Sequence, residues 1–538
     1  MILLQNLRVP LAHEMQTLLN LACRRLQIEP LAVKELRVLK KSVDARDKAE
    51  IHFVFHLLVG LEDEAAEEPL ARQAGMELHA PPKMPALPEA PRGRLRPVVV
   101  GAGPAGLLAA LILAKAGARP LLIERGRPVE RRQADVADFF ASGRLDPSSN
   151  VLFGEGGAGT FSDGKLTTGI KSPYIPFILD EFVKAGAPEE ILYAAKPHIG
   201  TDFLPKMLKG LRERILALGG EIRFGTKLTG LVQGAGRLRA LRAEGENGQE
   251  ELPCEALLLC IGHSARDTFA MLAESGLRME QKAFSIGLRI EHPQALIDRA
   301  QYGEFAGHPA LGAAEYKLSC HLPNGRSVYS FCMCPGGRVL AASSEEGLLN
   351  INGMSAFARD GENANSALLC SVEPGDFGGE GPLAGIEFQR QFEKKAFELG
   401  GGRFRAPAQR MEDFLAGRAS RALGALRPSF APGVTPADLR ACLPGFAAES
   451  IRQALPQFAR RVRGFTDHES VLMGVETRSS SPLRIPRDKN SLQGSILGLY
   501  PCGEGAGYAG GILSAAADGA RCAIALLEAG QAPPLRGD

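Results

Sequence analysis

Short hydrophobic runs at the start of the chain have the spacing of a small α+β domain. Residues 2–9 alternate between hydrophobic and polar positions as a strand does, and residues 11–26 repeat hydrophobic side chains at helical spacing. Residues 35–39 and 51–59 are rich in β-branched and aromatic residues and predict two more strands. Between them residues 40–48, KKSVDARDK, predict a charged turn, which is either a solvated hairpin end or a loop that binds a partner or a phosphate.

A proline-rich segment separates this part from the rest of the chain. Between residues 62 and 96 an acidic stretch gives way to prolines at positions 81, 82, 85, 88 and 91. Prolines at this density interrupt helices and central strands, because each one fixes φ and lacks a backbone N–H. We therefore expect a semi-extended linker over residues 62–96.

From Pro97 onward strand-like and helix-like runs alternate, as a doubly wound sheet requires. Residues 97–117 predict a buried strand, a glycine turn and an Ala/Leu-rich helix, and residues 499–530 repeat this order. The middle of the chain is richer in strands. We expect an α/β fold, in which a Rossmann-like dinucleotide-binding domain contains an inserted β-rich α+β substrate domain. The predicted divisions are a small N-terminal α+β domain over residues 1–61, a linker over 62–96, the dinucleotide-binding domain over 97–280 and 491–538, and the substrate domain over 281–490.

Composition narrows the class of protein and its compartment. Of the 538 residues, 45% are hydrophobic and 23% are charged, which is typical of globular domains and excludes wholesale disorder. The 63 basic and 61 acidic residues give a net charge of +2, so net charge provides no argument for a nucleic-acid-binding or polybasic membrane protein. Ten scattered cysteines, the lack of a signal sequence and the lack of a long hydrophobic run lead us to expect a soluble protein of the reducing cytoplasm.

Glycine is in excess, at 62 residues, and its first cluster has the form of a dinucleotide-binding motif. Gly101, Gly103 and Gly106 follow a hydrophobic strand with the spacing G-x-G-x-x-G. The first glycine permits a tight turn, the second lets the backbone approach a pyrophosphate, and the third lets the helix pack closely on the strand. Glu124 ends the next predicted strand, where a carboxylate accepts a hydrogen bond from a ribose hydroxyl. The motif by itself predicts FAD or NAD.

Two further glycine clusters favour FAD. Residues 154–164 contain five glycines, more than a surface loop requires, and residues 500–512 bring Glu504 close to the start of a second predicted helix. A flavin uses both features of the last cluster, since a carboxylate accepts hydrogen bonds from ribitol hydroxyls and a helix N-terminus stabilises negative charge on the reduced ring. We therefore expect the three clusters to meet around one FAD molecule.

Several segments together resemble a known group of flavoproteins. The Gly101 motif, the strand ALLLCIGHSARD and the closing CGEGAGYAGGILSAAADG resemble the glutathione-reductase-like FAD superfamily over residues 96–527. Within that span GEGGAGTFSDGKL, FCMCPGG, NGMS, NANS and ETRSSSPLRI resemble the bacterial family labelled uncharacterised FAD-dependent dehydrogenases, or NAD(P)/FAD-dependent oxidoreductases. The resemblance implies a glutathione-reductase-like fold and FAD as cofactor, and it names no substrate. It assigns Gly101, Gly103 and Gly106 to the pyrophosphate, Glu124 to the adenosine ribose, Arg132 to the neighbourhood of the diphosphate, Gly156, Gly157 and Thr160 to the flavin edge, Gly262 to a crossing under the cofactor, Gly503 and Glu504 to the ribitol, and Gly511 and Ile512 to the pyrimidine side.

Candidate catalytic residues are marked less sharply. His198 and His263 lie beside predicted cofactor loops, where each is either a proton donor or a hydrogen-bonded structural residue. Lys165 could face the flavin or an anionic substrate. Arg478 and Arg484 form a cationic segment that suits a carboxylate or phosphate, with a salt-bridged turn as the alternative.

Cysteine spacing provides little support for thiol or metal chemistry. Cys332 and Cys334 would share one face of a strand, which fits two small buried residues better than a reactive pair. The chain has no C-x₄-C dithiol near its flavin loop, and no cluster of histidines and cysteines has metal-ligand spacing. No metal site is predicted.

These patterns lead to one main hypothesis and one alternative. The main hypothesis is a dehydrogenase-like FAD-dependent oxidoreductase that transfers a hydride between flavin N5 and a small organic substrate. NAD(P)H would act only as a transient reductant, because the sequence lacks a second G-x-G-x-x-G between a strand and a helix. The alternative is a flavin-binding redox sensor, or an RNA- or protein-associated factor without turnover, whose N-terminal domain contacts the partner. Neither a membrane nor, in the main hypothesis, a nucleic acid is expected as a partner.

Overall fold

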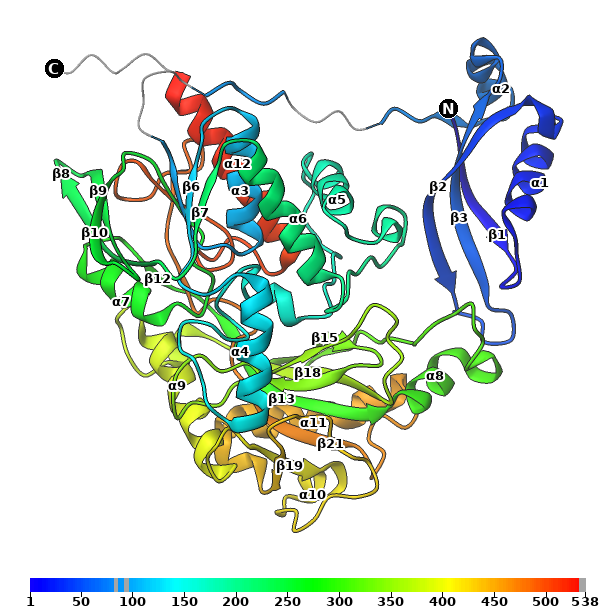
Figure 1. Cartoon of the computed structure of the whole chain (residues 1–538). Coiled ribbons are helices and arrows are strands. Elements are labelled where there is room, and N and C mark those ends of the chain that lie inside the picture. Colours follow the sequence, from blue (N-terminus) through cyan, green and yellow to red (C-terminus); the bar gives the residue numbers. More distant parts are fainter. Residues whose placement is uncertain (82–85, 91–95, 532–538) are drawn as a thin grey trace.

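A computed structural model describes residues 1–81, 86–90 and 96–531, and Figure 1 shows how their elements are arranged. The N-terminal unit contains a four-stranded antiparallel sheet with two helices, and it lies to one side of the rest of the chain. Ile2, Leu4, Phe53, Phe55 and Leu57 share its core, because alternate residues of each strand point to the same face. Its elements are β1 (Ile2–Val9), α1 (Met15–Leu26), β2 (Val33–Asp44), β3 (His52–Leu61), α2 (Glu67–Gln73) and β4 (Glu77–Leu78), and the strand order is β2-β3-β1-β4.

Two sequence predictions for this unit are wrong in part. The charged run over residues 40–48 begins as strand, because β2 continues to Asp44 and pairs with β3 throughout. The segment over residues 62–96 is not an extended linker from its start, because α2 forms within it and β4 pairs with β1. Acidic residues in the first turn of α2 favour a helix at that point. The predicted linker prolines 82, 85 and 91 lie outside the described residues.

Strand β2 is one of the two outer strands of this sheet, and its backbone is hydrogen-bonded to residues 193–195. The N–H of Lys41 donates to the carbonyl oxygen of Tyr193 at 2.8 Å. The N–H of Ala195 donates to the carbonyl oxygen of Lys41 at 2.9 Å. These two hydrogen bonds form a short parallel bridge.

The next unit is built on a five-stranded parallel sheet, with helices packed against it (Figure 1). Helix α3 (Pro104–Lys115) is hydrophobic on all sides, because it lies in the interior and packs against helix α12 (Ile512–Gln531). A Cβ at Gly519 of α12 would stand 2.1 Å from the carbonyl oxygen of Ala105, so the two helices touch backbone to backbone. The sheet order is β23-β11-β5-β6-β7, from β5 (Val98–Val100), β6 (Leu121–Ile123), β7 (Glu221–Arg223), β11 (Leu257–Leu259) and β23 (Leu499–Pro501).

Smaller elements surround this parallel sheet. Four helices and an antiparallel three-stranded sheet in the order β10-β9-β8 belong to this part of the chain. They are α4 (Val129–Ser142), α5 (Ile175–Lys184), α6 (Leu204–Ala217), α7 (Arg266–Glu274), β8 (Lys227–Gly234), β9 (Arg237–Gly245) and β10 (Gly248–Pro253).

A seven-stranded mixed sheet forms the third part of the molecule (Figure 1). Its central strand, β13 (Phe284–Pro293), is buried on both faces. Leu288 and Ile290 point into a hydrophobic core with Phe458, whereas Arg289 and Glu291 point to the other, polar face. The order is β14-β15-β18-β13-β21-β19-β20, from β14 (Ser319–His321), β15 (Ser327–Cys334), β18 (Asn363–Val372), β19 (Ala406–Arg410), β20 (Val434–Pro436) and β21 (Val471–Glu476).

Within the described ranges, no helix combines the length and the hydrophobicity that crossing a membrane requires.

The third part is completed by α-helices and by two pairs of short strands. The remaining helices and strands are α8 (Gln294–Tyr302), α9 (Ala384–Leu399), α10 (Met411–Ala416), α11 (Gly445–Arg461), β12 (Glu280–Gln281) with β22 (Leu483–Arg484), and β16 (Arg338–Ala341) with β17 (Ile351–Met354).

Candidate cofactor and active site

A cavity of about 550 Å³ is lined by residues of both the parallel-sheet unit and the mixed sheet. Part of its wall comes from the three glycine clusters, represented by Gly103, Gly157 and Gly511. Another part comes from the mixed sheet and the segment that follows it, including Cys332 and Arg478. Segments that are distant in the sequence therefore converge on one site, as predicted for the three clusters.

The first cluster has the local geometry that a dinucleotide needs. Gly101 has φ +101°, and a Cβ at Gly106 would stand 1.8 Å from the Gly101 carbonyl oxygen, so helix α3 requires glycine there. At Gly103, no described atom outside the residue and its chain neighbours lies within 4 Å of the position of a Cβ, and this open space is next to the N-terminus of α3. Unpaired helix N–H groups beside open space suit a pyrophosphate. The residues present therefore fit the group that the sequence predicts.

Glu124 follows β6 and connects the first and second glycine clusters. Its carboxylate accepts hydrogen bonds from the N–H groups of Ala102 at 2.8 Å, Gly126 at 2.9 Å and Gly154 at 3.1 Å. The side chain is 6% exposed and also lines the cavity. Glu124 thus lines the cavity and organises the backbone of both loops.

Arg132 lies behind the second cluster, on α4, and the expected contact with a diphosphate is corrected. Its side chain is fully buried, and burial lowers its pKa to about 9. All five N–H groups of its guanidinium donate to the loop over residues 150–160, so they are not free for a diphosphate. The acceptors are the carbonyl oxygens of Asn150, Val151, Glu155 and Gly157 and the hydroxyl of Thr160, at 2.6 to 2.9 Å.

The second cluster divides into residues that face the cavity and residues that wrap around Arg132. Gly157 lines the cavity, and a Cβ there would stand 3.3 Å from Cα of Gly103. At Gly156 a Cβ would stand 2.2 Å from the Thr160 hydroxyl oxygen, and Thr160 itself is bonded to Arg132. Gly156 and Thr160 therefore shape the loop from behind, while Gly157 is placed at the predicted cofactor surface.

The third cluster is tied to helix α12. The N–H of Gly503 donates to a carboxylate oxygen of Asp518 at 2.8 Å, and Arg487 holds the same carboxylate through hydrogen bonds of 3.0 and 2.6 Å. Gly503 therefore acts through its backbone, whereas the next residue, Glu504, lines the cavity together with Gly511 and Ile512. Asp518 in α12 and Arg487 in the loop before β23 are functional residues to which no sequence motif assigned a role.

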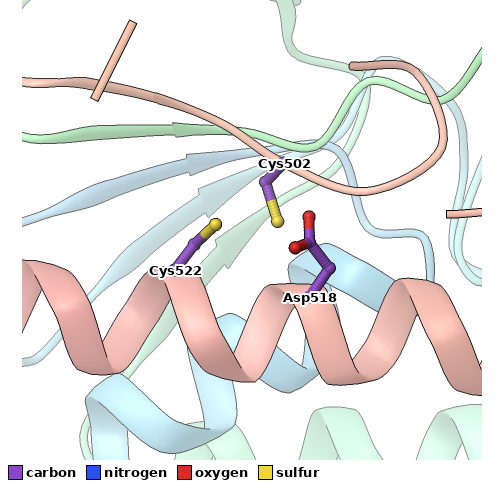
Figure 2. Close-up of side chains that lie close together, drawn as sticks. All are labelled: Cys502, Asp518 and Cys522. Carbon is purple, nitrogen blue, oxygen red and sulfur yellow. The ribbon is translucent and has the colours of Figure 1, made fainter. Parts of the chain in front are cut away.

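Cys502 and Cys522 lie beside this carboxylate, and Figure 2 shows the three side chains directed toward one another. Their ligand atoms are within 4.8 Å of one another, and their types would suit a metal. The Arg487 guanidinium already provides the positive charge, at 3.0 Å from Asp518 and 3.2 Å from the Cys522 sulfur. Hydrogen bonds among neighbouring thiols, together with burial, raise the pKa of both thiols and disfavour the thiolate that a metal needs. The ion pair of Arg487 and Asp518 holds the loop at Gly503 in place.

Glu504 is a half-buried carboxyl group at the cavity. Burial raises its pKa to about 7, the positive charge of Lys282 opposes this shift, and negative charge on Cys332 adds to it. Such a carboxyl group changes its charge near neutral pH. Gly262 lies next to this loop, since a Cβ at Gly505 would stand 2.3 Å from the Gly262 carbonyl oxygen. Gly262 also lines the cavity.

Lys165 and His198 form a backbone bridge, but they face different surroundings. Lys165 lines the cavity, and its ammonium group donates to the Asp163 carboxylate and to the carbonyl oxygen of Met333. The His198 ring stacks on Phe357 with ring centroids 5.0 Å apart and bonds to its carbonyl oxygen at 3.0 Å. The structure thus places His198 behind the cavity wall, as a hydrogen-bonded residue that does not line the cavity.

His263 lines the cavity as a neutral imidazole. Burial lowers its pKa to about 3, and the positive charges of Arg478 and Arg266 add to that shift. Its Nδ1 lies 3.0 Å from the hydroxyl of Ser264. At neutral pH this side chain offers a hydrogen bond to a bound molecule, and its low pKa opposes the role of proton donor.

Arg478 lines the cavity, but most of its hydrogen bonds are made within the protein. It donates to both oxygens of Glu393 at 2.9 and 2.8 Å and to the Ser344 hydroxyl at 2.7 Å. Arg484 is exposed and lies against the ring of Tyr508. The cationic segment predicted from the sequence is thus divided between a buried ion pair and a surface contact.

A second buried network is centred on Arg289, a residue that no sequence motif marked. The guanidinium donates to both oxygens of Glu476 at 2.7 and 3.1 Å, to Asn365 at 2.7 Å and to Asn352 at 3.0 Å. It also donates to the carbonyl oxygen of Cys332 at 3.3 Å. The segments NGMS, NANS and ETRSSS, which the sequence marked without a role, meet at this arginine.

Comparison with known families identifies the cofactor. The description "FAD-dependent protein, C-terminal domain-like" matches residues 283–479, and "FAD binding domain" matches residues 95–137. A domain of unknown function, DUF8436, matches residues 1–60. The second match contains the first glycine cluster and Glu124, which agrees with the geometry of that loop. Together these matches support the general class of FAD-dependent oxidoreductase.

Solved structures with a similar course of the chain are distant. A triple mutant of the flavin-dependent brominase Bmp2 has 12% identity and a TM-score of 0.38, with 82% of each chain covered. A geranylgeranyl bacteriochlorophyll reductase-like protein from Thermoplasma acidophilum has 13% identity and a TM-score of 0.34, with 80% of this chain and 77% of the other covered. Likenesses of this size carry no weight for function.

One relative covers nearly the whole sequence. An uncharacterized protein from Clostridium beijerinckii is 44% identical over 527 residues, which is 98% of this chain and 98% of the relative. The chain therefore belongs to the same family of FAD-dependent proteins as this clostridial relative, and FAD is its cofactor.

Proposed function

We propose that the protein is an FAD-dependent oxidoreductase in which a hydride passes between N5 of the flavin and a small organic substrate. The observation that carries this proposal is the shared cavity, whose wall includes Gly103 and Gly511 from the glycine clusters and Asn352 and Arg478 from the other part of the chain. A substrate bound at the second part of the wall would occupy the same cavity as the cofactor. FAD, when bound, supplies the two-electron chemistry.

In this proposal the chain's own residues bind, orient and exchange protons. The pyrophosphate would be bound by Gly103, Gly157 and the N-terminus of α3. The carboxylate of Glu124 would accept a hydrogen bond from a ribose hydroxyl. Glu504 would bind the ribitol, with Gly511 and Ile512 on the pyrimidine side. The Glu504 carboxyl group, whose pKa is raised to about 7, can hold or release a proton at neutral pH.

Different parts of the chain would bind the cofactor and the substrate. Residues 97–280 and 491–538 would form a glutathione-reductase-like FAD-binding domain, and residues 281–490 would form the substrate domain. The supporting observation is that the chain leaves the parallel sheet after β11 and returns to it with β23.

FAD binding at this site is tested by filling the open space at Gly103. Gly103→Leu should purify without flavin, because its side chain would occupy the space before α3. Gly375→Leu is the matched control, since Gly375 is exposed and a Cβ there meets no described atom within 4 Å. The measurement is the ratio of flavin absorbance to protein after gel filtration. Equal flavin content in the two variants would contradict the site.

Turnover is tested by anaerobic reduction of the wild-type holoprotein with NADH and NADPH separately, followed by reoxidation with a metabolite panel. We expect one nucleotide or one metabolite to bleach the flavin. In a parallel aerobic reaction, oxygen consumption with a hydroxylated product would show a monooxygenase, whereas anaerobic reoxidation by a metabolite would show a dehydrogenase. A flavin that none of these compounds reduces or reoxidises at a useful rate would favour a redox sensor without turnover.

A further inference from the structure

Strand β15 ends in the sequence Cys-Met-Cys, and its course there is irregular. Pairing with β18 is regular up to Phe331 opposite Ala367 and resumes with Cys334 opposite Asn365, so β15 contains one more residue than its partner. Cys332 has φ +43°, a value that residues other than glycine rarely adopt. Bulges and positive φ values redirect side chains and are concentrated near active sites.

This bulge folds the end of the strand back on itself. The Cys334 thiol donates to the Cys332 carbonyl oxygen at 3.3 Å, and the two side chains shift each other's pKa in opposite directions. Cys332 is partly exposed and lines the cavity, whereas Cys334 is fully buried behind it. An accessible sulfur with a second sulfur behind it is the arrangement of an attacking and a resolving cysteine.

Two cations stabilise negative charge on the accessible sulfur. Lys165 donates to the carbonyl oxygen of Met333, between the two cysteines, and Arg289 donates to that of Cys332 at 3.3 Å. The hydrogen bond from Cys334, followed by the charges of Lys165 and Arg289, lowers the pKa of the Cys332 thiol against the opposing effects of burial and Asp163. The pKa of Cys334 is raised.

Other cysteines of the chain have the opposite environment. Burial raises the pKa of the thiols of Cys254, Cys370 and Cys442, which lie in hydrophobic cores. Two small buried residues would require neither cations bonded to the neighbouring carbonyl oxygens nor a left-handed backbone. The surroundings of Cys332 therefore differ from those of a packing residue.

We propose that Cys332 and Cys334 are a redox-active pair that exchanges two electrons with the FAD bound in the same cavity, a proposal that rests on the function proposed above. In one direction a bond forms between the two sulfur atoms, both thiol hydrogens are lost, and two electrons and two protons pass to oxidised FAD, which becomes reduced. In the other direction reduced FAD returns them and the S–S bond breaks. The site thus stores two electron pairs, one on the flavin and one on the thiols.

The pair can be observed directly, because trypsin cleavage after Arg326 and Arg338 releases both cysteines in one peptide with no third cysteine. The holoprotein is equilibrated in glutathione redox buffers, alkylated and digested. We expect this peptide to change reversibly between a doubly alkylated form and an unalkylated form two hydrogens lighter than the dithiol. A peptide that stays doubly alkylated in every buffer would overturn the proposal.

Coupling to the flavin is tested by anaerobic titration with dithionite after mild oxidation. The wild-type holoprotein should take up about four electrons per FAD, and Cys332→Ser and Cys334→Ser about two, since each two-electron couple contributes one pair. Cys320→Ser, in the neighbouring strand β14, is the matched control and should take up about four. Uptake of two electrons by the wild type would overturn the pair while leaving the flavoprotein intact, whereas a protein without flavin absorbance would instead contradict the proposed function.

The role of Lys165 is tested by the rate at which iodoacetamide modifies Cys332 at neutral pH. Lys165→Gln should slow this rate severalfold without changing the number of thiols, because the thiolate is the reacting form. Lys196→Gln is the control, since Lys196 also lines the cavity but pairs with Glu315. An unchanged rate in Lys165→Gln would contradict the assignment of Cys332 as the attacking sulfur.

Discussion

The two ends of the cavity are built in different ways. At the end formed by the glycine clusters, the wall includes the backbone of several glycines, with open space at Gly103 and N–H groups at the start of α3. At the end formed by the mixed sheet, buried charges such as Arg289 and Glu476 are paired within the protein, although they are 187 positions apart in the sequence. A short contiguous segment can preorganise the first end, whereas the second end exists only in the folded chain. The first should therefore be sensitive to added volume, and the second to the loss of one partner of a pair.

The largest effect is expected at the charged end. Arg289→Met should lower the free energy of unfolding by about 3–5 kcal/mol, because Glu476 would be left as an unpaired buried charge. Chemical denaturation of the holoprotein measures this change. The double variant Arg289→Met, Glu476→Met should recover most of the loss, since it removes both charges. Equal destabilisation of the single and double variants would show that packing, and not pairing, governs this end.

At the glycine end the sensitive change is one added methyl group. Gly106→Ala should destabilise the protein by about 3 kcal/mol and deplete it of FAD, because its Cβ would stand 1.8 Å from the Gly101 carbonyl oxygen. Gly375→Ala, at an exposed glycine, is the control and should retain its flavin. Thermal unfolding and flavin content measure the two effects. Wild-type flavin content in Gly106→Ala would contradict the requirement for close packing of α3.

Glu504 lies where the two ends meet, and its effect should depend on pH. Its folded pKa of about 7 is above the ordinary value of 4.5, so the folded protein binds more protons than the unfolded chain between these values. Stability of the FAD-free protein should therefore fall as pH rises from about 4.5 to 7, by at most about 2 kcal/mol for a partly exposed group. Glu504→Gln should lack this decrease. Parallel pH profiles of the two proteins in denaturation experiments would contradict the raised pKa.

The smallest effect is expected at His198, which lies behind the wall and belongs to neither end. His198→Asn should change stability by less than about 1 kcal/mol and leave flavin reduction within about twofold of the wild type. Stopped-flow reduction of the holoprotein measures the rate. If His198→Asn lowered the rate of flavin reduction as much as a substitution of a residue that lines the cavity, His198 would again be a candidate catalytic residue.

The same difference between the two ends explains what could be predicted from the sequence. Gly101, Gly103, Gly106 and Glu124 lie in one strand-turn-helix segment and its next strand, so local pattern was sufficient to place them. Arg132 was assigned to the wrong contact, because the five acceptors that surround it depend on the course of a later loop. The bulge at Cys332 has no signal in hydrophobic alternation, since a register shift depends on the partner strand.

The charged run over residues 40–48 has a further consequence once its first half is known to be strand. Strand β2 is 12 residues long and forms the outer edge of its sheet, and among the described residues only the bridge at Lys41 covers that edge. An exposed edge is a template on which a second chain can add a strand, and lysines on it oppose such addition by repulsion between like charges. Strand β2 carries the exposed charged side chains of Lys34, Arg37 and Lys40, the first two paired with Glu64 and Glu35, and charged residues on an edge strand disfavour pairing with the sheet of a second copy.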